Sequence, residues 1–326
     1  MKVIIATNKT FGPPEVLEFI ESQTAKLKAN EFLVKGEYAT ASTADIRLRS
    51  KNVPRGFKFI MSIMFGFQKP KYECLGTDYS GTVVALGEVV TDLKIGDRVV
   101  VDLGMGLNGY RTYRSFKSKD VWAKLPEKVS TDIAVAAIFG GLTAKLFLWD
   151  KLNVRQQDRV LIIGAGGAVG SSAVQLAKFY GADVTAVCSA SKADVVKELG
   201  ASHVVDYQTE GWENKIQQFD IILDCVGVFT LKMARKHLKP HGRIGFVVAD
   251  MMLNLECVWS SIFSKQKFVA GAIQSTKKDL QFLLELIEQE KLKPLIGKRF
   301  SFKDIVAAHR EVESGHRLGA TLIEFE

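Results

Sequence analysis

The feature that most constrains this chain is a glycine cluster at positions 164–170, which joins an apolar run to an amphipathic segment. The apolar run, 159–163, is rich in branched residues and does not alternate, which is typical of a strand buried on both faces. The segment after the cluster places Val169, Ala173 and Leu176 on one face of a helix. Because a helix that starts at such a turn points its free N–H groups at a diphosphate, the sequence predicts a site for a dinucleotide or a similar anion.

The spacing of the glycines differs from the common dinucleotide motif. A G-x-G-x-x-G pattern that starts at Gly164 requires glycine at position 169, where the chain has valine, and the glycines fall three apart at Gly164, Gly167 and Gly170. Alone, such a cluster is also consistent with a plain turn between a core strand and a packed helix. A second apolar run, Val184–Cys188, follows the helix and completes one βαβ unit, which favours nucleotide binding.

Length and composition indicate a globular protein large enough for two domains. The 326 residues are 47% hydrophobic and 25% charged, so the chain can bury large cores. The formal net charge of +8 is moderate, and no Lys/Arg block or aromatic-basic repeat typical of nucleic-acid binding is found in the sequence. We therefore expect no nucleic-acid partner, and the basic charge suits a phosphorylated ligand.

Signals for export, for a membrane span and for cysteine chemistry are weak. The apolar stretch 1–7 is too short for a signal peptide, and the four cysteines have no paired spacing. We expect a cytoplasmic protein with no membrane span, no disulfide and no four-cysteine zinc site.

The first 125 residues have the alternation and turn signals of strands. Alternating residues at 32–38 and the turn 94–97 favour a small antiparallel barrel. The expected strands are Lys2–Thr7, Val16–Ile20, Phe32–Ala41, Gly81–Leu86, Arg98–Val101 and Tyr110–Phe116.

One insertion interrupts this pattern. Residues Val53–Phe67 are apolar, rich in Met and Phe, and too few to span a bilayer. Three interpretations stay open: a lid over an apolar substrate pocket, plain core packing, and a membrane-surface contact.

From about residue 125 the pattern alternates between helices and strands. We expect helices over 131–137 and 143–151, separated by Gly140 and Gly141, and a surface helix or loop over 256–263. Six strands among helices predict a doubly wound parallel sheet, and the last fifty residues are expected to return to the first domain. The six strands are Arg159–Ile163, Val184–Cys188, His203–Asp206, Asp220–Asp224, Arg243–Val248 and Lys267–Ile273.

Several motifs agree, in order, with one family; they are Ser42–Arg47, Gly76–Val83, Gly96–Val99, Gly141–Ala144, the glycine turn and Asp224–Gly227. Together they make the chain resemble the zinc-free branch of the medium-chain dehydrogenase/reductase superfamily, the quinone oxidoreductases related to zeta-crystallin, over essentially its whole length. The resemblance implies an α/β fold. A GroES-like β-barrel domain for catalysis and substrate binding would comprise residues 1–124 and 275–326, and a doubly wound Rossmann NADP-binding domain residues 125–274, with the active site between them.

The resemblance also bears on metal. The zinc alcohol dehydrogenases of this superfamily take ligands from a Cys and from a Gly-His-Glu, and the matching positions here are Ser42, Thr77 and Asp78. We therefore expect no metal. Without a Lewis acid, hydride addition to a conjugated acceptor is easier than dehydrogenation of a simple alcohol. The tyrosine of the mitochondrial enoyl-thioester reductases falls at Val53, which argues against that reaction.

The end of the second Rossmann strand indicates the cofactor. An NAD-specific site places Asp or Glu there, whereas this chain has Ser189, and the next charge is Lys192. In the quinone reductases that it resembles, a Ser, a Lys and a Tyr hold the 2′-phosphate, and these match Ser189, Lys192 and Tyr207. We therefore expect NADPH; the alternative is a solvated lysine and a capping aromatic.

Further cofactor contacts follow from the same resemblance. Thr143 would contact the nicotinamide carboxamide, although a helix N-cap after Gly140 and Gly141 explains it equally well. Quinone reductases usually have Asn where this chain has Ser42, and Gly-Lys where it has Gly319 and Ala320. The expected contacts are Ser42, Thr143, the turn residues Gly164, Gly167, Ala168, Val169 and Gly170, the ribose neighbour Val226, and the backbone of Phe246 and Val247.

No residue stands out as a general acid. Asp45 either lies beside the nicotinamide or completes a capping box begun by Ser42. Tyr79, Tyr110 and Tyr113 are candidates for proton donation, and so is water.

These features predict an NADPH-dependent oxidoreductase that transfers hydride to quinones, enones or related α,β-unsaturated carbonyls without a metal, its substrate a small apolar carbonyl or quinone. The alternatives are a non-catalytic NADPH-sensing or RNA-binding protein on the same fold, or a reductase or dehydrogenase of another carbonyl or alcohol.

The last expected strand, Lys267–Ile273, lies at the edge of its sheet and predicts a homodimer, since an exposed apolar edge pairs readily with another chain. In the competing account, Trp259, Ile262 and Phe263 fold back over the edge and leave a monomer.

Overall fold

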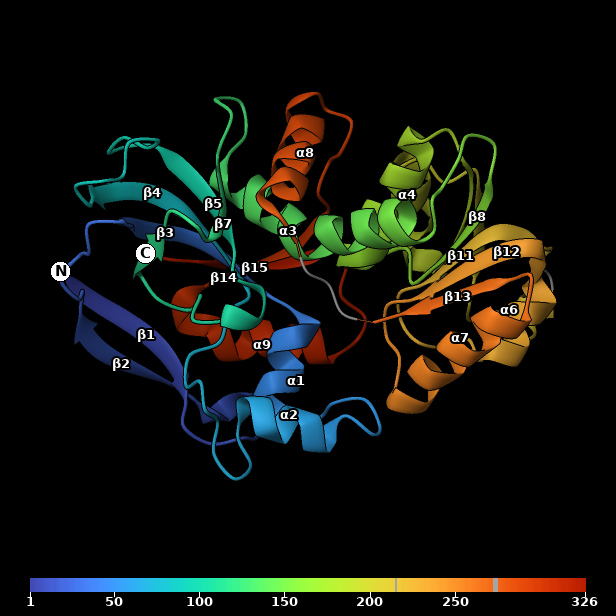
Figure 1. Ribbon diagram of the computed structural model, residues 1–326, viewed down its shortest axis with the longest axis horizontal. Helices are drawn as coiled ribbons and strands as arrows, with labels where there is room; N and C mark the ends of the chain where they lie inside the picture. The colour runs from blue at the N-terminus through green and yellow to red at the C-terminus, as the bar shows by residue number, and fades with distance from the viewer. Residues whose placement is uncertain (215, 272–274) are drawn as a thin grey trace.

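The structure, a computed structural model, describes residues 1–214, 216–271 and 275–326. These residues form two units that lie side by side along the longest axis of the molecule, each built on its own sheet (Figure 1). The α/β fold class expected from the sequence, a GroES-like barrel beside a Rossmann sheet, is confirmed. The exact domain boundaries stay a prediction, and one of them, residue 274, lies outside the described residues.

The first unit is a barrel-like sheet made from both ends of the chain. Its strands lie in the order β14–β15–β3–β4–β5–β7, with β6 also paired to β3. Strand β15 is antiparallel to β3 and places Leu322 opposite Thr40, so the end of the chain completes the sheet begun near its start. The strands of this unit are β1 (Lys2–Asn8) and β2 (Leu17–Gln23), which pair with each other, and β3 (Glu31–Ala41), β4 (Asp78–Leu86), β5 (Arg98–Asp102), β6 (Tyr113–Lys117), β7 (Val121–Lys124), β14 (Ile296–Ser301) and β15 (Ala320–Glu324).

Two helices pack against this sheet near the second unit. Helix α1 (Thr43–Ser50) contacts α9 (Ile305–Glu313), and the guanidinium of Arg49 joins them. Its Nη1 lies 2.9 Å from Nδ1 of His309, and its Nη2 bonds Glu313. This buried contact fixes α1, which carries the Ser42–Arg47 motif, against the C-terminal part of the chain.

The second unit is a six-stranded parallel sheet in the order β10–β9–β8–β11–β12–β13, which is the doubly wound order. The apolar run of β8 does not alternate because helices cover both faces: Ile162 packs with α3 and α4, and Ile163 with α6 and α7 (Figure 1). The strands are β8 (Arg159–Ile163), β9 (Asp183–Cys188), β10 (His203–Asp206), β11 (Phe219–Asp224), β12 (Leu238–Phe246) and β13 (Lys267–Ala270), and the helices are α4 (Ala168–Phe179), α5 (Ala193–Glu198), α6 (Leu231–His237) and α7 (Met251–Phe263).

A single long helix, α3 (Thr131–Lys145), replaces the two helices expected around Gly140 and Gly141. It continues into a π-helical turn, Leu146–Lys151. The expected break is wrong because these glycines serve packing: a Cβ on Gly140 would lie 2.2 Å from the carbonyl oxygen of Ala168, where α3 crosses α4. Residues 131–151 are long and apolar enough to cross a membrane, but 72% of their apolar window is buried inside the protein, as in a core helix.

The insertion at 53–67 forms a loop and the short helix α2 (Lys58–Phe65). Plain core packing is wrong for most of it, because Phe59 and Phe67 are 67% and 60% exposed. Ser62 and Phe65 are buried and hold the helix on the barrel. The loop reaches the second unit, where the N–H of Met251 donates to the carbonyl oxygen of Arg55 (3.0 Å).

The edge of the parallel sheet differs from the expectation. Strand β13 ends at Ala270, and residues 272 and 273 of the expected strand lie outside the described residues. Trp259, Ile262 and Phe263 do not fold back over the edge, since they are 67–72% exposed on α7. Instead the hydroxyl of Ser261 bonds both the N–H and the carbonyl oxygen of Phe268, each at 3.0 Å. The account in which these three side chains cover the edge is therefore wrong.

The last helix before the C-terminal strands is α8 (Lys277–Glu288), which packs on α3 and β7. It starts with a capping box between Thr276 and Asp279. Together with α3 it fills the space between the two sheets on one side of the molecule (Figure 1).

Candidate cofactor and substrate site

The glycine turn lies at the carboxyl end of β8, where the winding of the sheet reverses between β8 and β11. Gly164 has a φ of +80°, and a Cβ there would lie 2.8 Å from the Val226 side chain on the loop after β11. A Cβ on Gly170 would lie 2.2 Å from the carbonyl oxygen of Gly164, so the helix starts very close to the strand. Helix α4 has no side-chain cap at Gly167, which leaves its first N–H groups for a ligand.

Three predicted phosphate-binding residues lie together beside this turn. The N–H of Tyr207 donates to the carbonyl oxygen of Cys188 (3.2 Å), which brings Tyr207 next to Ser189 at the ends of β10 and β9. The stem of Lys192 packs over the turn, because a Cβ on Gly166 would lie 2.5 Å from its Cδ. Burial lowers the pKa of Lys192. Lys192 is half-buried against the turn, so the alternative of a solvated lysine fits less well, and the alternative of Tyr207 as a capping aromatic stays open.

The loop after β11 is shaped by the buried carboxylate of Asp224, which the sequence analysis named in the motif Asp224–Gly227 without giving it a role. Asp224 accepts hydrogen bonds from the N–H groups of Val226 (3.0 Å), Gly227 (2.8 Å) and Phe229 (2.8 Å). Burial raises its pKa, and these three bonds act against that rise. The loop therefore holds Val226, which is 50% exposed, over the glycine turn. The signal in the sequence for this loop was an acid at the end of an apolar strand with a glycine soon after it.

The backbone after β12 is only partly free to meet a cofactor. Phe246 is fully buried, and the N–H of Val247 donates to the carbonyl oxygen of Asp224 (2.9 Å). Thr143 is also buried, and its hydroxyl donates to the carbonyl oxygen of Phe139 (2.6 Å) within α3. Because it lies inside a continuous helix, its interpretation as an N-cap is wrong.

On the barrel side, Ser42 and Asp45 form the capping box that starts α1. The Asp45 carboxylate accepts from the Ser42 hydroxyl (2.6 Å) and N–H (2.9 Å) and from the N–H of Gly76 (2.9 Å). Burial raises the pKa of Asp45, and the bonds from Ser42 and Gly76 oppose it. The structural interpretation of Asp45 is therefore confirmed; a contact with nicotinamide stays a prediction.

The positions matched to zinc ligands come together in space. The hydroxyl oxygens of Ser42 and Thr77 are 3.4 Å apart, and Asp78 is bonded by the N–H (2.7 Å) and hydroxyl (2.5 Å) of Thr40. Among the described residues, no group of three or more His, Cys, Asp or Glu could hold a metal ion. Two hydroxyls and an already bonded carboxylate are a poor ligand set for zinc.

Two of the tyrosine candidates for proton donation are wrong. Tyr79 is fully buried in the barrel core and donates to the carbonyl oxygen of Arg111 (3.0 Å). Tyr110 is also fully buried and donates to the carbonyl oxygen of Thr40 (3.1 Å). Burial raises the pKa of both phenols. Tyr113 lies on β6, and nothing in the structure gives it a role in a site.

The C-terminal segment 317–319 joins the barrel to the glycine turn. The N–H of Gly319 donates to the carbonyl oxygen of Gly166 (2.8 Å), and the Lys192 ammonium donates to the carbonyl oxygen of Arg317 (2.9 Å). The Arg317 guanidinium reaches the carbonyl oxygen of Ala41 (3.1 Å). A cavity of about 10 Å³ between Ala168 and Arg317, room for one water molecule, remains here. Arg317 was missed because its neighbours are far away in sequence.

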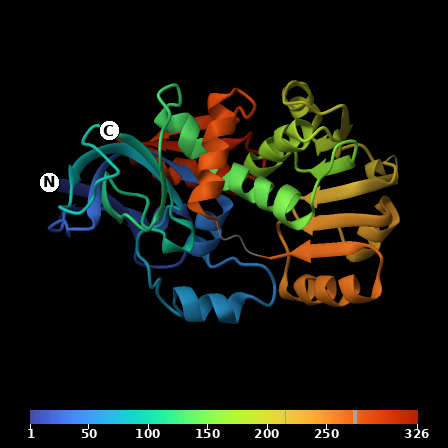
Figure 2. The same cartoon turned by 45° about the horizontal axis from the view of Figure 1, so that its top comes forward.

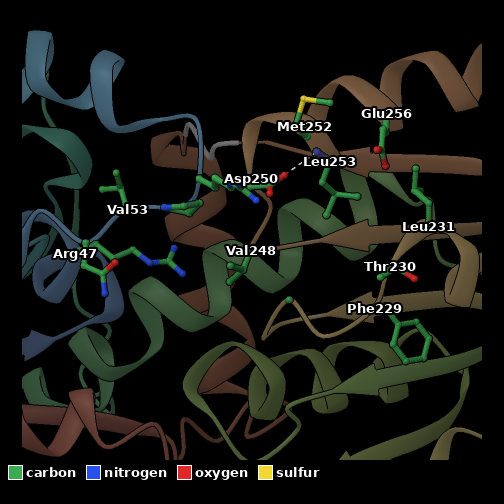
Figure 3. A pocket seen from close by; sticks show the side chains of 14 residues that line it. Arg47, Val53, Phe229, Thr230, Leu231, Val248, Asp250, Met252, Leu253 and Glu256 are labelled. Atoms are coloured by element: carbon green, nitrogen blue, oxygen red, sulfur yellow. Dashed lines mark hydrogen bonds between the residues drawn. The ribbon is translucent and has the colours of Figure 1, made fainter.

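A much larger cavity of about 530 Å³ opens beside the loops after β11 and β12 (Figure 3). Four of its fourteen lining residues come from the barrel-side loop Asn52–Arg55, and Arg47 enters from α1. The opposite wall contains Gly227, Phe229, Thr230, Leu231, Val248, Asp250, Met252, Leu253 and Glu256. The apolar residues of α2 do not line it, so the lid interpretation fits only the loop before that helix.

A glycine turn at the switch point of a doubly wound sheet, facing a barrel across a cavity, defines the class of two-domain nucleotide-binding oxidoreductases. Two family models match the chain: an alcohol dehydrogenase GroES-like domain over residues 28–145, and a zinc-binding dehydrogenase over residues 199–323.

Relatives with solved structures or curated names agree. The structure of the quinone oxidoreductase from Coxiella burnetii is 27% identical, with a TM-score of 0.87 and 100% of both chains covered. The chloroplastic quinone-oxidoreductase QR1 of Triphysaria versicolor is 28% identical, covering 94% of each chain. The human mitochondrial NAD(P)H oxidoreductase RTN4IP1 is 28% identical, covering 96% of this chain and 87% of its own length. The chain belongs to the medium-chain dehydrogenase/reductase superfamily, in its quinone oxidoreductase branch.

Proposed function

We propose that this protein is an NADPH-dependent oxidoreductase that transfers hydride to quinones, enones or related α,β-unsaturated carbonyls without a metal ion. The observation that carries the proposal is the position of Lys192, Ser189 and Tyr207 beside the glycine turn, where β9 ends without a carboxylate. A lysine and two hydroxyls at this place bind a 2′-phosphate, whereas an NAD site needs an acid there.

Different segments of the chain would bind different parts of the cofactor. The N–H groups at the start of α4 hold the diphosphate, and the Asp224-shaped loop supports the ribose with Val226 and Gly227. When bound, NADPH supplies the hydride. The protein orients the reacting groups, which is the larger part of catalysis in such reactions. With Tyr79 and Tyr110 buried and bonded elsewhere, the proton comes from water in the cavity.

The metal-free part of the proposal rests on the ligand set. Ser42 and Thr77 occupy positions where the zinc enzymes have thiolate and imidazole, and both Asp45 and Asp78 are engaged by N–H and hydroxyl donors. Quinones, enones and related α,β-unsaturated carbonyls suit a site without a metal ion, because the negative charge that develops on hydride addition spreads over their conjugated system.

The test is a steady-state assay of NADPH oxidation with 1,2-naphthoquinone, 9,10-phenanthrenequinone and small enones, run before and after chelation. We expect turnover of at least one acceptor and no loss of rate with the chelator. Cofactor binding without turnover of any acceptor would favour an NADPH sensor. Stoichiometric zinc in the purified protein, together with loss of activity on chelation, contradicts the metal-free proposal.

Assembly and location complete the proposal. Helix α7 exposes an apolar stripe next to the edge strand β13, and this stripe supports a homodimer joined along this side. The stripe consists of Met252, Leu255, Val258, Trp259, Ile262 and Phe263. The names of two relatives place those proteins in the chloroplast and the mitochondrion. For this chain we propose the cytoplasmic location that the sequence led us to expect.

A further inference from the structure

The large cavity is not the apolar pocket that a simple quinone requires. Its wall carries four charged side chains, Arg47, Arg55, Asp250 and Glu256, beside apolar residues. It lies beside the loops after β11 and β12, and its lining includes Gly227, which the proposed function gives to the cofactor ribose, and Val248, which follows the expected contact Val247. An acceptor that enters this cavity would lie next to the cofactor bound in the proposed way.

Arg47 is the charged residue that α1 contributes to the cavity wall. In Figure 3 its guanidinium extends from α1 toward Val248. Among the residues that the structure describes, no hydrogen bond or ion pair involves the Arg47 side chain, although it is partly buried and burial lowers its pKa. Arg49, two residues further along the same helix, is bonded to Gly12, His309 and Glu313. The side chain of Arg49 therefore holds α1 in place, whereas the guanidinium donors of Arg47 are free to bind a ligand.

The acids in the cavity wall do not neutralise Arg47. Asp250 is the N-cap of α7, and its carboxylate accepts a hydrogen bond from the N–H of Leu253 (2.7 Å). Glu256 is exposed and lies about two helical turns further along α7. In the described part of the chain, no ion pair joins either acid to Arg47 or Arg55. A partly desolvated guanidinium with five donors and no partner is matched in shape by a planar carboxylate.

We propose that the natural acceptor carries a carboxylate, and that Arg47 binds it in the cavity as the specificity-determining residue. This deepens the proposed function and rests on it: the substrate is an anionic α,β-unsaturated carbonyl, anchored at Arg47 with its conjugated end toward Val248. The cavity volume of about 530 Å³ accommodates a molecule of this size beside the cofactor. Arg55, on the loop that contacts Met251, adds a second positive charge at the same wall.

The experiment compares trans-4-oxo-2-pentenoate with its methyl ester as acceptors for NADPH, in wild type, Arg47→Met and Arg155→Met. Arg155 is an exposed arginine before β8, at the end of that strand opposite the glycine turn, and controls for loss of one surface charge. Because the ester is intrinsically more electrophilic, the quantity that decides is the acid-to-ester ratio of kcat/KM. We expect Arg47→Met to lower this ratio roughly 10- to 100-fold, with the ester little changed, and Arg155→Met to leave it unchanged.

An unchanged ratio in Arg47→Met, with quinone or ester turnover intact, overturns the inference and leaves the proposed function standing. If no acceptor is reduced at all, the proposed function fails instead, and calorimetric titration of trans-4-oxo-2-pentenoate into wild type and Arg47→Met then decides the binding. Binding lost only in Arg47→Met supports the carboxylate site, and equal binding to both proteins contradicts it. Thermal unfolding of each variant confirms that it folds.

Discussion

At the scale of single residues, function here depends on which charged groups already have partners. Arg49 and Asp224 are buried and fully engaged in holding α1 and the loop after β11. Lys192 is intermediate, because its ammonium donates to the carbonyl oxygen of Arg317 but remains half-exposed at the turn. A ligand phosphate competes only with that one neutral acceptor, so Lys192 can exchange it for a stronger charge-assisted bond.

Lys192→Ala is expected to weaken NADPH binding by roughly 10- to 100-fold and to leave NADH almost unchanged, since a lost charge-assisted bond costs ~1.5–3 kcal/mol. Equilibrium titration of both cofactors measures this. Lys197→Ala is the matched control, because Lys197 lies on α5, the helix that Lys192 precedes, and among the described residues its ion pair is with the exposed Asp194 at 3.8 Å. Equal losses for NADPH and NADH in Lys192→Ala would contradict the assignment of the 2′-phosphate site.

At the scale of elements, the crossing of α3 and α4 determines how closely the glycine turn approaches the rest of the protein. Gly140 meets the backbone of Ala168 at this crossing, and Gly141 meets the side chain of Leu283 on α8. The helix passes through both glycines because α4 and α8 support it there. Intrinsic propensity alone favours alanine over glycine in a helix by ~0.5–1 kcal/mol.

Gly140→Ala is nevertheless expected to lower the free energy of unfolding by ~1–3 kcal/mol, since the new methyl group meets backbone atoms that cannot turn away. Urea unfolding followed by circular dichroism measures the change. Gly106→Ala is the control, because a Cβ there meets no atom within 4 Å. A Gly140→Ala protein as stable as wild type would show that α3 and α4 can separate at no cost.

At the scale of the whole molecule, two apolar helix surfaces, α2 and α7, lie on the same lower face in both views (Figures 1 and 2). The stripe on α7 lies next to the edge strand β13, where Ser261 bonds the backbone groups of Phe268. The dimer contact is therefore expected to use side chains of α7 more than free backbone groups of the strand.

Ile262→Glu is expected to convert a dimer, of twice the 36.0 kDa chain mass, into a monomer, because it places a charge within the apolar stripe. Light scattering at micromolar concentration reads the mass. Ile63→Glu on α2 is the control, with 57% exposure against 67% for Ile262, and should leave the mass unchanged. A wild-type mass of 36.0 kDa refutes the dimer, and loss of the dimer in Ile63→Glu alone would move the contact to α2.

The sequence by itself determined the features that local spacing encodes: the strand, turn and helix at Gly164–Gly170, the doubly wound order of six strands, and the capping box of Ser42 and Asp45. The turn and the capping box depend on neighbours within a few residues, and the doubly wound sheet was predicted from the alternation of strands and helices along the chain. The Ser189 and Lys192 pair was also readable, because both follow one strand end.

Only the tertiary structure decided which groups are free to act. Tyr79 and Tyr110 are excluded as proton donors because they are buried. Helix α3 continues past its two glycines because α4 packs against it there. Arg47 and Arg317 gained importance for the opposite reason: one faces a cavity walled by residues 180 positions away and more, the other bonds Ala41 across the molecule. Burial and partnership are set by contacts between distant segments, and no local pattern records them.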